Sequence, residues 1–89
     1  MFRLWAKEFK DNRLVRDLVV CNDNYEISRT QKIFSALDEV CHAFDLQVPI
    51  WLEVNVNDFK RHSRARFRQD SFVEQIDFDF LEIQVIEED

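Results

Sequence analysis

Residues 2–21, FRLWAKEFKDNRLVRDLVVC, decide the fold. Two runs of β-forming residues, 2–9 and 14–21, flank a short polar segment. Asp11 and Asn12, at the centre of that segment, both tolerate the left-handed backbone conformation that a two-residue hairpin turn requires. The stretch therefore predicts a β-hairpin with its turn at these two residues.

The turn also predicts how the two strands pair. Uninterrupted pairing places these residues opposite one another: Phe9 and Leu14, Trp5 and Leu18, Arg3 and Val20, Leu4 and Val19, and Phe2 and Cys21. Both faces of the hairpin then carry apolar side chains, and a single helix covers only one of them.

An amphipathic helix is predicted over Ser28 to Phe44. Its apolar residues recur at helical spacing: Ile33, Phe34, Leu37, Val40, Cys41 and Phe44. Ser28 and Gln31 have the spacing of a capping box at the start of a helix. Pro49 biases the residue before it toward extended geometry, so the helix is expected to end before it.

Two strands are predicted after the helix. In residues 50–56, apolar residues at even positions alternate with other residues, which indicates a strand with Trp51 on the face away from the helix. Residues 78–86 are rich in Phe, Ile and Val, but their alternation slips. This last strand is expected to have either a β-bulge near Phe80 and Leu81 or two buried faces.

The polar and basic segment 58–69 separates these strands and is predicted to be either a short helix capped by Asn57 or an ordered loop. The whole chain is expected to form one small globular domain over residues 1–89. Its fold class is predicted to be α+β, with a mostly antiparallel sheet of about four strands and one long amphipathic helix. The predicted order of elements is β-β-α-β-(basic segment)-β.

The composition of the 89 residues excludes several classes of function. The absence of Gly removes phosphate-binding loops and the nucleophile elbow, which need glycine backbone geometry. No apolar run approaches the roughly 20 residues that span a bilayer, and early charges such as Lys7 interrupt any signal peptide. A cytoplasmic protein without membrane contact is expected. Cys21 and Cys41 are expected to be reduced and buried.

Positive charge is concentrated in one segment, although the net charge of the chain is −6. The candidate partner-binding cations are Lys60, Arg61, Arg64, Arg66 and Arg68. From Asp70 onward the chain carries carboxylates and no cation. The basic segment is expected to bind an acidic protein surface or nucleic-acid phosphate, or to be neutralised by the acidic segment within the chain or across a dimer.

The sheet face away from the helix is a second candidate surface. Trp5 and Trp51 are expected on it, with cations between the aromatic residues. Such a face suits stacking of unpaired bases, or contact with a protein partner or a second copy of the chain. A further alternative is that Phe59, Phe67 and Phe72 of the same chain cover it.

Catalytic and metal-binding patterns are weak. Cys21, Cys41, His42 and His62 lack the spacing of zinc ligands, so no metal or other cofactor is expected. Asp58 and His62 stand one helical turn apart, which suits an acid–base pair, but catalysis there would require a concave pocket beside His62. No enzymatic activity is expected.

The strings DFKRHSRARF at 58–67 and DFDFLEIQVIEED at 77–89 resemble a recurrent pattern in small, functionally uncharacterised bacterial proteins of about this length. The resemblance implies a free-standing cytoplasmic protein and carries over no activity, ligand or catalytic residue. The leading hypothesis is therefore a non-enzymatic protein-interaction module that binds itself or an acidic protein surface. The alternative is binding of single-stranded nucleic acid through the same Arg and Trp residues.

Overall fold

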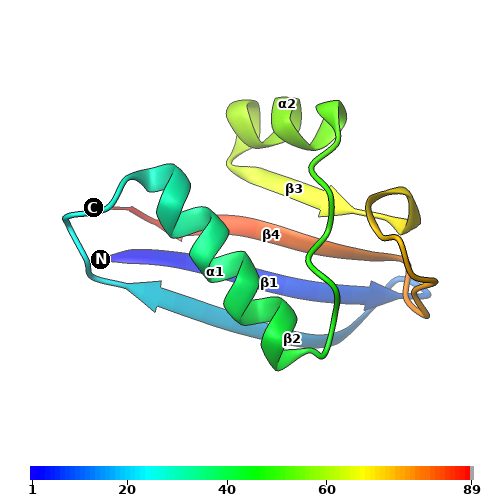
Figure 1. The fold of residues 1–89 in the computed structure, drawn as a ribbon. Helices are drawn as coiled ribbons and strands as arrows, with labels where there is room; N and C mark the ends of the chain where they lie inside the picture. The colour runs from blue at the N-terminus through cyan, green and yellow to red at the C-terminus, as the bar shows by residue number, and fades with distance from the viewer. Residues whose placement is uncertain (89) are drawn as a thin grey trace.

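The computed structural model describes residues 1–88 and has an α+β fold with a four-stranded antiparallel sheet. The sheet order is β2-β1-β4-β3, and α1 crosses one face of the sheet (Figure 1). The strands and helices, including the 3₁₀ turn η1, are β1 (Phe2–Lys10), β2 (Arg13–Asn22), α1 (Arg29–Ala43), α2 (Glu53–His62), β3 (Arg64–Phe67), η1 (Gln69–Ser71) and β4 (Phe80–Glu87). The predicted class is confirmed, but the predicted order is wrong. No strand forms at 50–56, where α2 begins instead. The segment 58–69, predicted to be a helix capped by Asn57 or a loop, contains the end of α2, which is capped at Leu52, and then the strand β3.

The hairpin forms with the predicted turn. Asp11 and Asn12 adopt positive φ angles of 53° and 64°, as a two-residue turn between twisted strands requires. Phe9 pairs with Leu14, but the register then shifts between Glu8 and Phe9, because Val15 is an extra residue on β2. The expected pairs beyond this bulge are therefore wrong by one position.

The shift changes the partner of every residue farther along β1. The observed pairs are Trp5 with Val19, Arg3 with Cys21, Leu4 with Val20, and Phe2 with Asn22. It leaves the two faces of β1 unchanged, because successive side chains still point to opposite sides.

Helix α1 begins and ends close to the predicted residues. The Ser28 hydroxyl accepts a hydrogen bond from Gln31 N, and the Gln31 side chain accepts one from Ser28 N, which completes the capping box. At the other end, Arg16 donates to the carbonyl oxygen of Phe44 at 2.9 Å and also binds the buried carboxylate of Glu8. This network ties the end of α1 to the hairpin.

The core lies between α1 and the sheet. Its buried residues include Leu4, Ala6, Leu81 and Ile83 from the strands and Leu37, Val40 and Cys41 from α1. Burial raises the pKa of the Cys41 thiol to about 11, and nearby Asp38 adds to the effect. Both cysteines are free, but Cys21 is exposed, contrary to the prediction that both are buried.

Helix α2 corrects the strand predicted over residues 50–56. Ile50 and Val54, expected in the core, are exposed. The side chain of Asn55 accepts a hydrogen bond from Leu52 N at 2.9 Å and donates one to Arg66 O at 2.8 Å, so it both starts α2 and fixes the helix to β3. The apolar alternation is thus a feature of an irregular segment followed by a helix.

The final strand begins at Phe80, two residues later than predicted. Phe78 precedes the strand and packs edge-to-face against Phe72, with ring centroids 5.9 Å apart. The slip in the alternation therefore marks the start of β4 and not a bulge at Phe80 and Leu81. The register irregularity of β4 lies at its other end, opposite Arg3 and Leu4.

Candidate interaction surface

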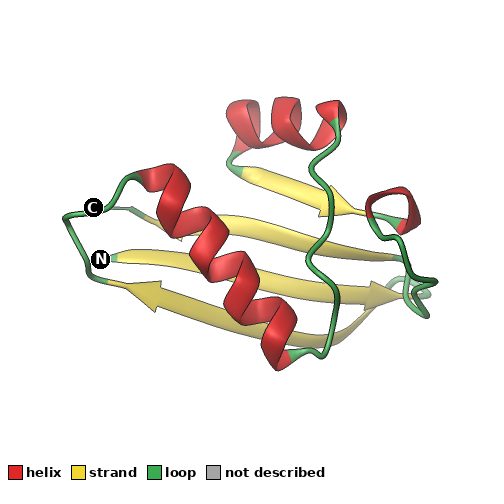
Figure 2. Cartoon of the chain, viewed as in Figure 1, coloured by secondary structure: helices red, strands yellow, loops and turns green. Residues whose placement is uncertain are grey.

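The sheet has a second face that no helix of residues 1–88 covers. Helix α1 lies across one face and α2 lies beside β3 (Figure 2). On β1, the even-numbered side chains from Phe2 to Glu8 are buried, whereas Arg3 is exposed and Trp5, Lys7 and Phe9 are partly exposed. We call the side that carries these odd-numbered residues the open face.

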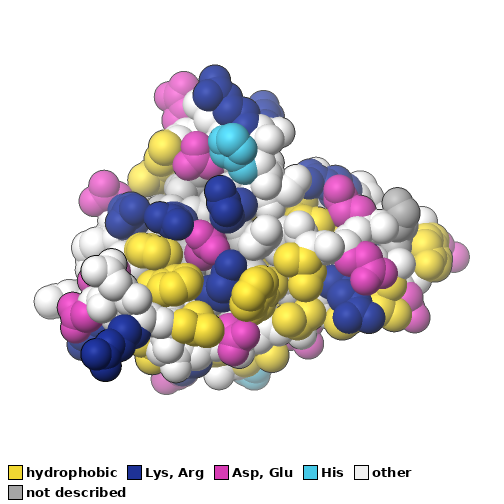
Figure 3. Space-filling view, turned by 180° about the vertical axis from the view of Figure 1, so that it is seen from behind, with side chains coloured by type: hydrophobic (Ala, Val, Ile, Leu, Met, Phe, Trp, Pro, Cys, Tyr) yellow, Lys and Arg dark blue, Asp and Glu magenta, His cyan; other side chains and the backbone are white. Residues whose placement is uncertain are grey.

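Figure 3 shows the molecule from behind, with hydrophobic side chains interrupted by basic and acidic ones. The strand register arranges the residues of the open face in rows that run across the sheet. The central row contains Asp17 on β2, Lys7 on β1, Glu82 on β4 and Arg66 on β3. We call these four residues the charged row. Its charges alternate in sign from one edge of the sheet to the other.

Glu82 is the centre of the charged row. Its carboxylate forms ion pairs with Lys7 Nζ at 2.7 Å and with Arg66 Nε at 2.9 Å. The Glu82 side chain is only 5% exposed and that of Lys7 only 12%. Burial by itself raises the pKa of Glu82, but the hydrogen bonds and charges of Lys7 and Arg66 outweigh it and hold that pKa below its ordinary value.

Apolar and aromatic side chains lie on both sides of the charged row. One flanking row joins Leu14, Phe9 and Phe80, and the rings of Phe9 and Phe80 stack with centroids 5.1 Å apart. The other flanking row joins Val19 and Trp5. The Trp5 indole donates to Asp17 Oδ2 at 2.8 Å, and Lys7 Nζ lies 3.9 Å from the centroid of the Trp5 ring.

Several of these apolar residues are strongly exposed. Leu14 and Val19 are 47% and 42% exposed, and both belong to the edge strand β2. The bulge residue Val15, next to Leu14 on the same strand, is 54% exposed. Exposed apolar side chains gathered beside charged groups on a sheet face are typical of a protein-interaction surface.

The predicted site residues lie in three places: on the open face, in the last turn of α2 and, for Trp51, against the core. Arg66 belongs to the open face, and the strand alternation puts Arg64 on the same side. The guanidinium group of Arg68 lies 5.1 Å from the ring centroid of Phe80, which joins it to this face. Lys60 and Arg61 are exposed in the last turn of α2, away from the sheet.

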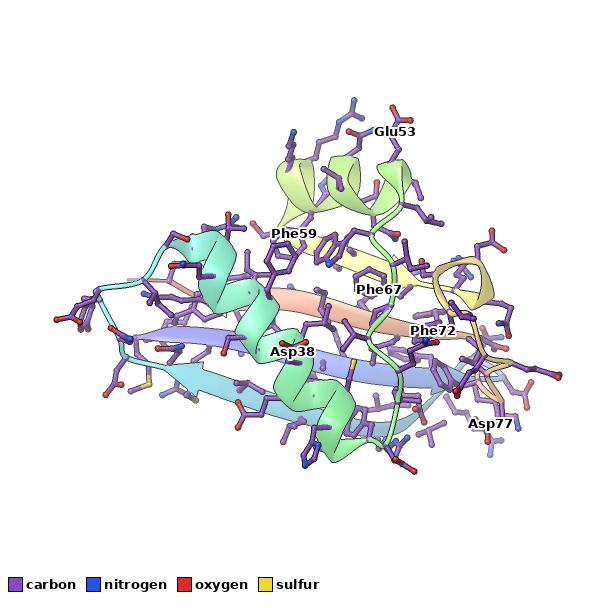
Figure 4. The ribbon with its side chains drawn as sticks, in the orientation of Figure 1. Asp38, Glu53, Phe59, Phe67, Phe72 and Asp77 are labelled. Atoms are coloured by element: carbon purple, nitrogen blue, oxygen red, sulfur yellow. The ribbon has the colours of Figure 1, made fainter. Side chains whose placement is uncertain are left out.

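The predicted position of Trp51 is wrong. It does not lie on the open face but packs on the α1 side of the sheet, where its ring meets those of Phe34, Phe59 and Phe67 edge to face at centroid distances of 5.0 to 5.9 Å. Figure 4 shows Phe59 and Phe67 in this region between α1, α2 and the sheet. With Phe72 also buried on the core side, the predicted cover of the open face by Phe59, Phe67 and Phe72 does not occur.

A groove of about 490 Å³ lies between α2 and β3. Asp58 and His62 line it together with Arg64, Arg68 and Asp70. The concave pocket required for catalysis at His62 is therefore present, but among residues 1–88 no hydrogen bond joins Asp58 to His62. The described residues also contain no group of three or more His, Cys, Asp or Glu side chains placed to hold a metal ion.

Sequence reasoning missed Asp17 and Val19 of the open face, because the bulge in β2 moves them to the side of Lys7 and Trp5, whereas the expected pairing placed Val19 opposite Leu4. It also missed Phe80 and Glu82. Both lie on β4, and they join the site because β4 pairs with β1. The signal that was available is the alternation of Phe80, Glu82 and Gln84 with the buried Leu81 and Ile83.

Comparisons of the chain with family models, with curated proteins and with solved structures gave no match. None of the helices in residues 1–88 combines the length and the apolar character needed to cross a membrane.

Proposed function

We propose that this protein is a non-enzymatic, cytoplasmic interaction module that self-associates through the open face. The observation that carries the proposal is the exposed apolar surface on either side of the charged row, on a sheet face that both helices leave uncovered. Burial of such a surface against another sheet stabilises by roughly 25 cal/mol for each Å² removed from water. Arg64, Arg66 and Arg68 then border the contact and meet carboxylates of the second copy.

The charge distribution favours a protein partner over a nucleic acid. Glu82 on the central strand β4 and Asp17 on the edge strand β2 place two carboxylates on the open face, and both oppose the approach of a phosphate backbone. A protein surface tolerates both signs because it can offer both signs in return.

Val19→Asp is expected to convert a dimer into a monomer, because it puts a charge into the apolar row beside Trp5. Val73→Asp is the matched control, because it makes the same substitution at an exposed valine that lies in the loop after η1 and not on the open face. Sedimentation velocity over a broad concentration range measures the mass, and circular dichroism checks that both variants fold. A wild-type protein that stays monomeric at every concentration overturns the proposal.

Binding of single-stranded nucleic acid is the second candidate function. The observation in its favour is that Trp5 and Phe80 lie beside Lys7, Arg66 and Arg68 on an exposed sheet. In a Trp51→Phe variant, whose tryptophan fluorescence comes from Trp5 alone, short oligonucleotides are then expected to quench that emission, and added salt to reverse the quenching. Unchanged emission at low salt removes this candidate.

A further inference from the structure

The charges of the charged row alternate in sign across the sheet. From β2 to β3 the row reads negative, positive, negative, positive, at Asp17, Lys7, Glu82 and Arg66. When a second copy of this row is turned end for end and placed against the first, each charge faces a charge of the opposite sign. The open face is therefore complementary to a second open face in one orientation.

We infer that two copies stack open face to open face about a two-fold axis parallel to β1 and β4, so that Asp17 of one copy contacts the partner's Arg66. This inference rests on the proposed self-association. The axis lies between β1 and β4, so β2 of each copy faces β3 of the other and β1 faces β4. Lys7 then lies toward the partner's Glu82, and Phe9 toward the partner's Phe80.

The alternative face-to-face orientation has its two-fold axis across the strands. That operation leaves the strand order unreversed, so Asp17 would face the partner's Asp17 and Arg66 the partner's Arg66. Like charges across an interface disfavour the wrong arrangement strongly. The charged row therefore selects one of the two orientations, while the apolar rows contribute to either.

The contact between Asp17 and Arg66 is the most informative one, because both residues are exposed whereas Lys7 and Glu82 are largely buried against each other. Within the chain, Asp17 accepts a hydrogen bond from Trp5 and Arg66 pairs with Glu82. Stacked sheets lie about 10 Å apart and cross at about 30°. That crossing displaces residues of the edge strands by only about 4 Å, which is within the reach of an Arg side chain. The Arg66 side chain is 50% exposed, so its guanidinium group has surface left for a second carboxylate.

Charge reversal at either residue tests the inference. Asp17→Arg places an arginine against the partner's Arg66 twice in each dimer, so the dimer dissociation constant is expected to rise by about tenfold or more. Arg66→Glu is expected to raise the dissociation constant to the same extent, because it places a glutamate against the partner's Asp17 twice in each dimer. Mixing the two variants in equal amounts restores association, because one contact then joins the introduced arginine to the introduced glutamate and the other keeps the native pair.

Two further variants keep the test interpretable. Arg66→Glu places a carboxylate beside Glu82 and can fail to fold, so the double variant Asp17→Arg with Arg66→Gln is measured as well. It is expected to associate more tightly than Asp17→Arg alone, because the repulsion between the two arginines is gone. Asp38→Arg is the matched control on the exposed side of α1 and is expected to leave the dissociation constant unchanged.

The outcomes separate the two proposals. A monomeric wild-type protein overturns the self-association and this arrangement together. A dimer that Val19→Asp dissociates but Asp17→Arg leaves unchanged keeps the open face as the interface and overturns the arrangement. Weakening by Asp17→Arg without recovery in the mixture or in the double variant also overturns it.

Discussion

Glu82→Gln is expected to lower the free energy of unfolding by about 3 kcal/mol at neutral pH. The substitution keeps the size of the side chain but removes the charge that holds Lys7 Nζ at 2.7 Å. Lys7 is only 12% exposed, so its ammonium group stays largely out of water without a carboxylate. Arg66 is half exposed and recovers hydration, which keeps the effect at the lower end of the range for a broken buried pair.

Urea denaturation measures this loss, and Glu87→Gln is its matched control. Glu87 pairs with Arg3 at 3.2 Å, but both side chains are nearly half exposed. An exposed ion pair contributes little, so the control is expected to change the free energy of unfolding by less than about 1 kcal/mol. Equal effects of the two substitutions would contradict the role of burial.

The same pair of proteins gives a pH dependence with a definite sign. The pKa of Glu82 in the folded protein is lower than its ordinary value of 4.5. The ionised form of Glu82 therefore stabilises the folded protein fully at pH values above the ordinary pKa. This stabilisation is lost as the pH falls through the pKa that Glu82 has in the folded protein, which is the lower of the two. The stability gap between the wild type and Glu82→Gln is expected to narrow as the pH falls below about 4.5. A gap that widens with acid would show that the charge of Glu82 is unfavourable.

The local parts of the fold could be predicted from the sequence. Asp11 and Asn12 specify their turn through their own backbone preferences, and Ser28 with Gln31 specifies the start of α1. Each of these signals acts over a few residues. Strand alternation also places Arg3, Trp5, Lys7 and Phe9 on one face without knowledge of their partners.

The remaining parts depend on contacts between distant residues. Residues 50–56 alternate like a strand, but the packing of the partly buried Trp51 against three Phe rings and the hydrogen bond from Asn55 to β3 favour a loop and a helix. The pattern of residues in the sequence does not indicate that β4 pairs with β1, so the position of Glu82 beside Lys7 could not be predicted. The β1 residues of the open face were therefore visible in the hairpin. Its β2 residues depended on the unpredicted bulge, and its β3 and β4 residues required the topology.

Phe67→Ala is expected to lower the free energy of unfolding by about 3 to 5 kcal/mol, a large part of the total for a small domain. Phe67 is fully buried on β3, and its ring centroid lies 5.0 Å from that of Trp51. The substitution leaves a cavity where α1, α2 and β3 meet. Thermal or urea denaturation followed by circular dichroism measures the loss.

Phe34→Ala is the control, because Phe34 packs against the same Trp51 ring at 5.9 Å but is 49% exposed on α1. Its removal opens no enclosed cavity, so a loss of about 1 kcal/mol is expected. A loss as large as that of Phe67→Ala would show that contact with Trp51, and not burial in the core, determines the effect.

The Phe67 substitution also links the core to the open face. Strand β3 is short, lies at the edge of the sheet, and carries Arg64 and Arg66 on its outer side. Its inner side is held by Phe67 and Ala65, so loss of the Phe67 ring is expected to loosen β3 before β1 and β2. Amide hydrogen exchange in Phe67→Ala is therefore expected to accelerate in residues 64–67 well before the hairpin. Uniform acceleration across the sheet would instead show that the four strands unfold as one unit, and that the arginines cannot be released separately from the rest of the open face.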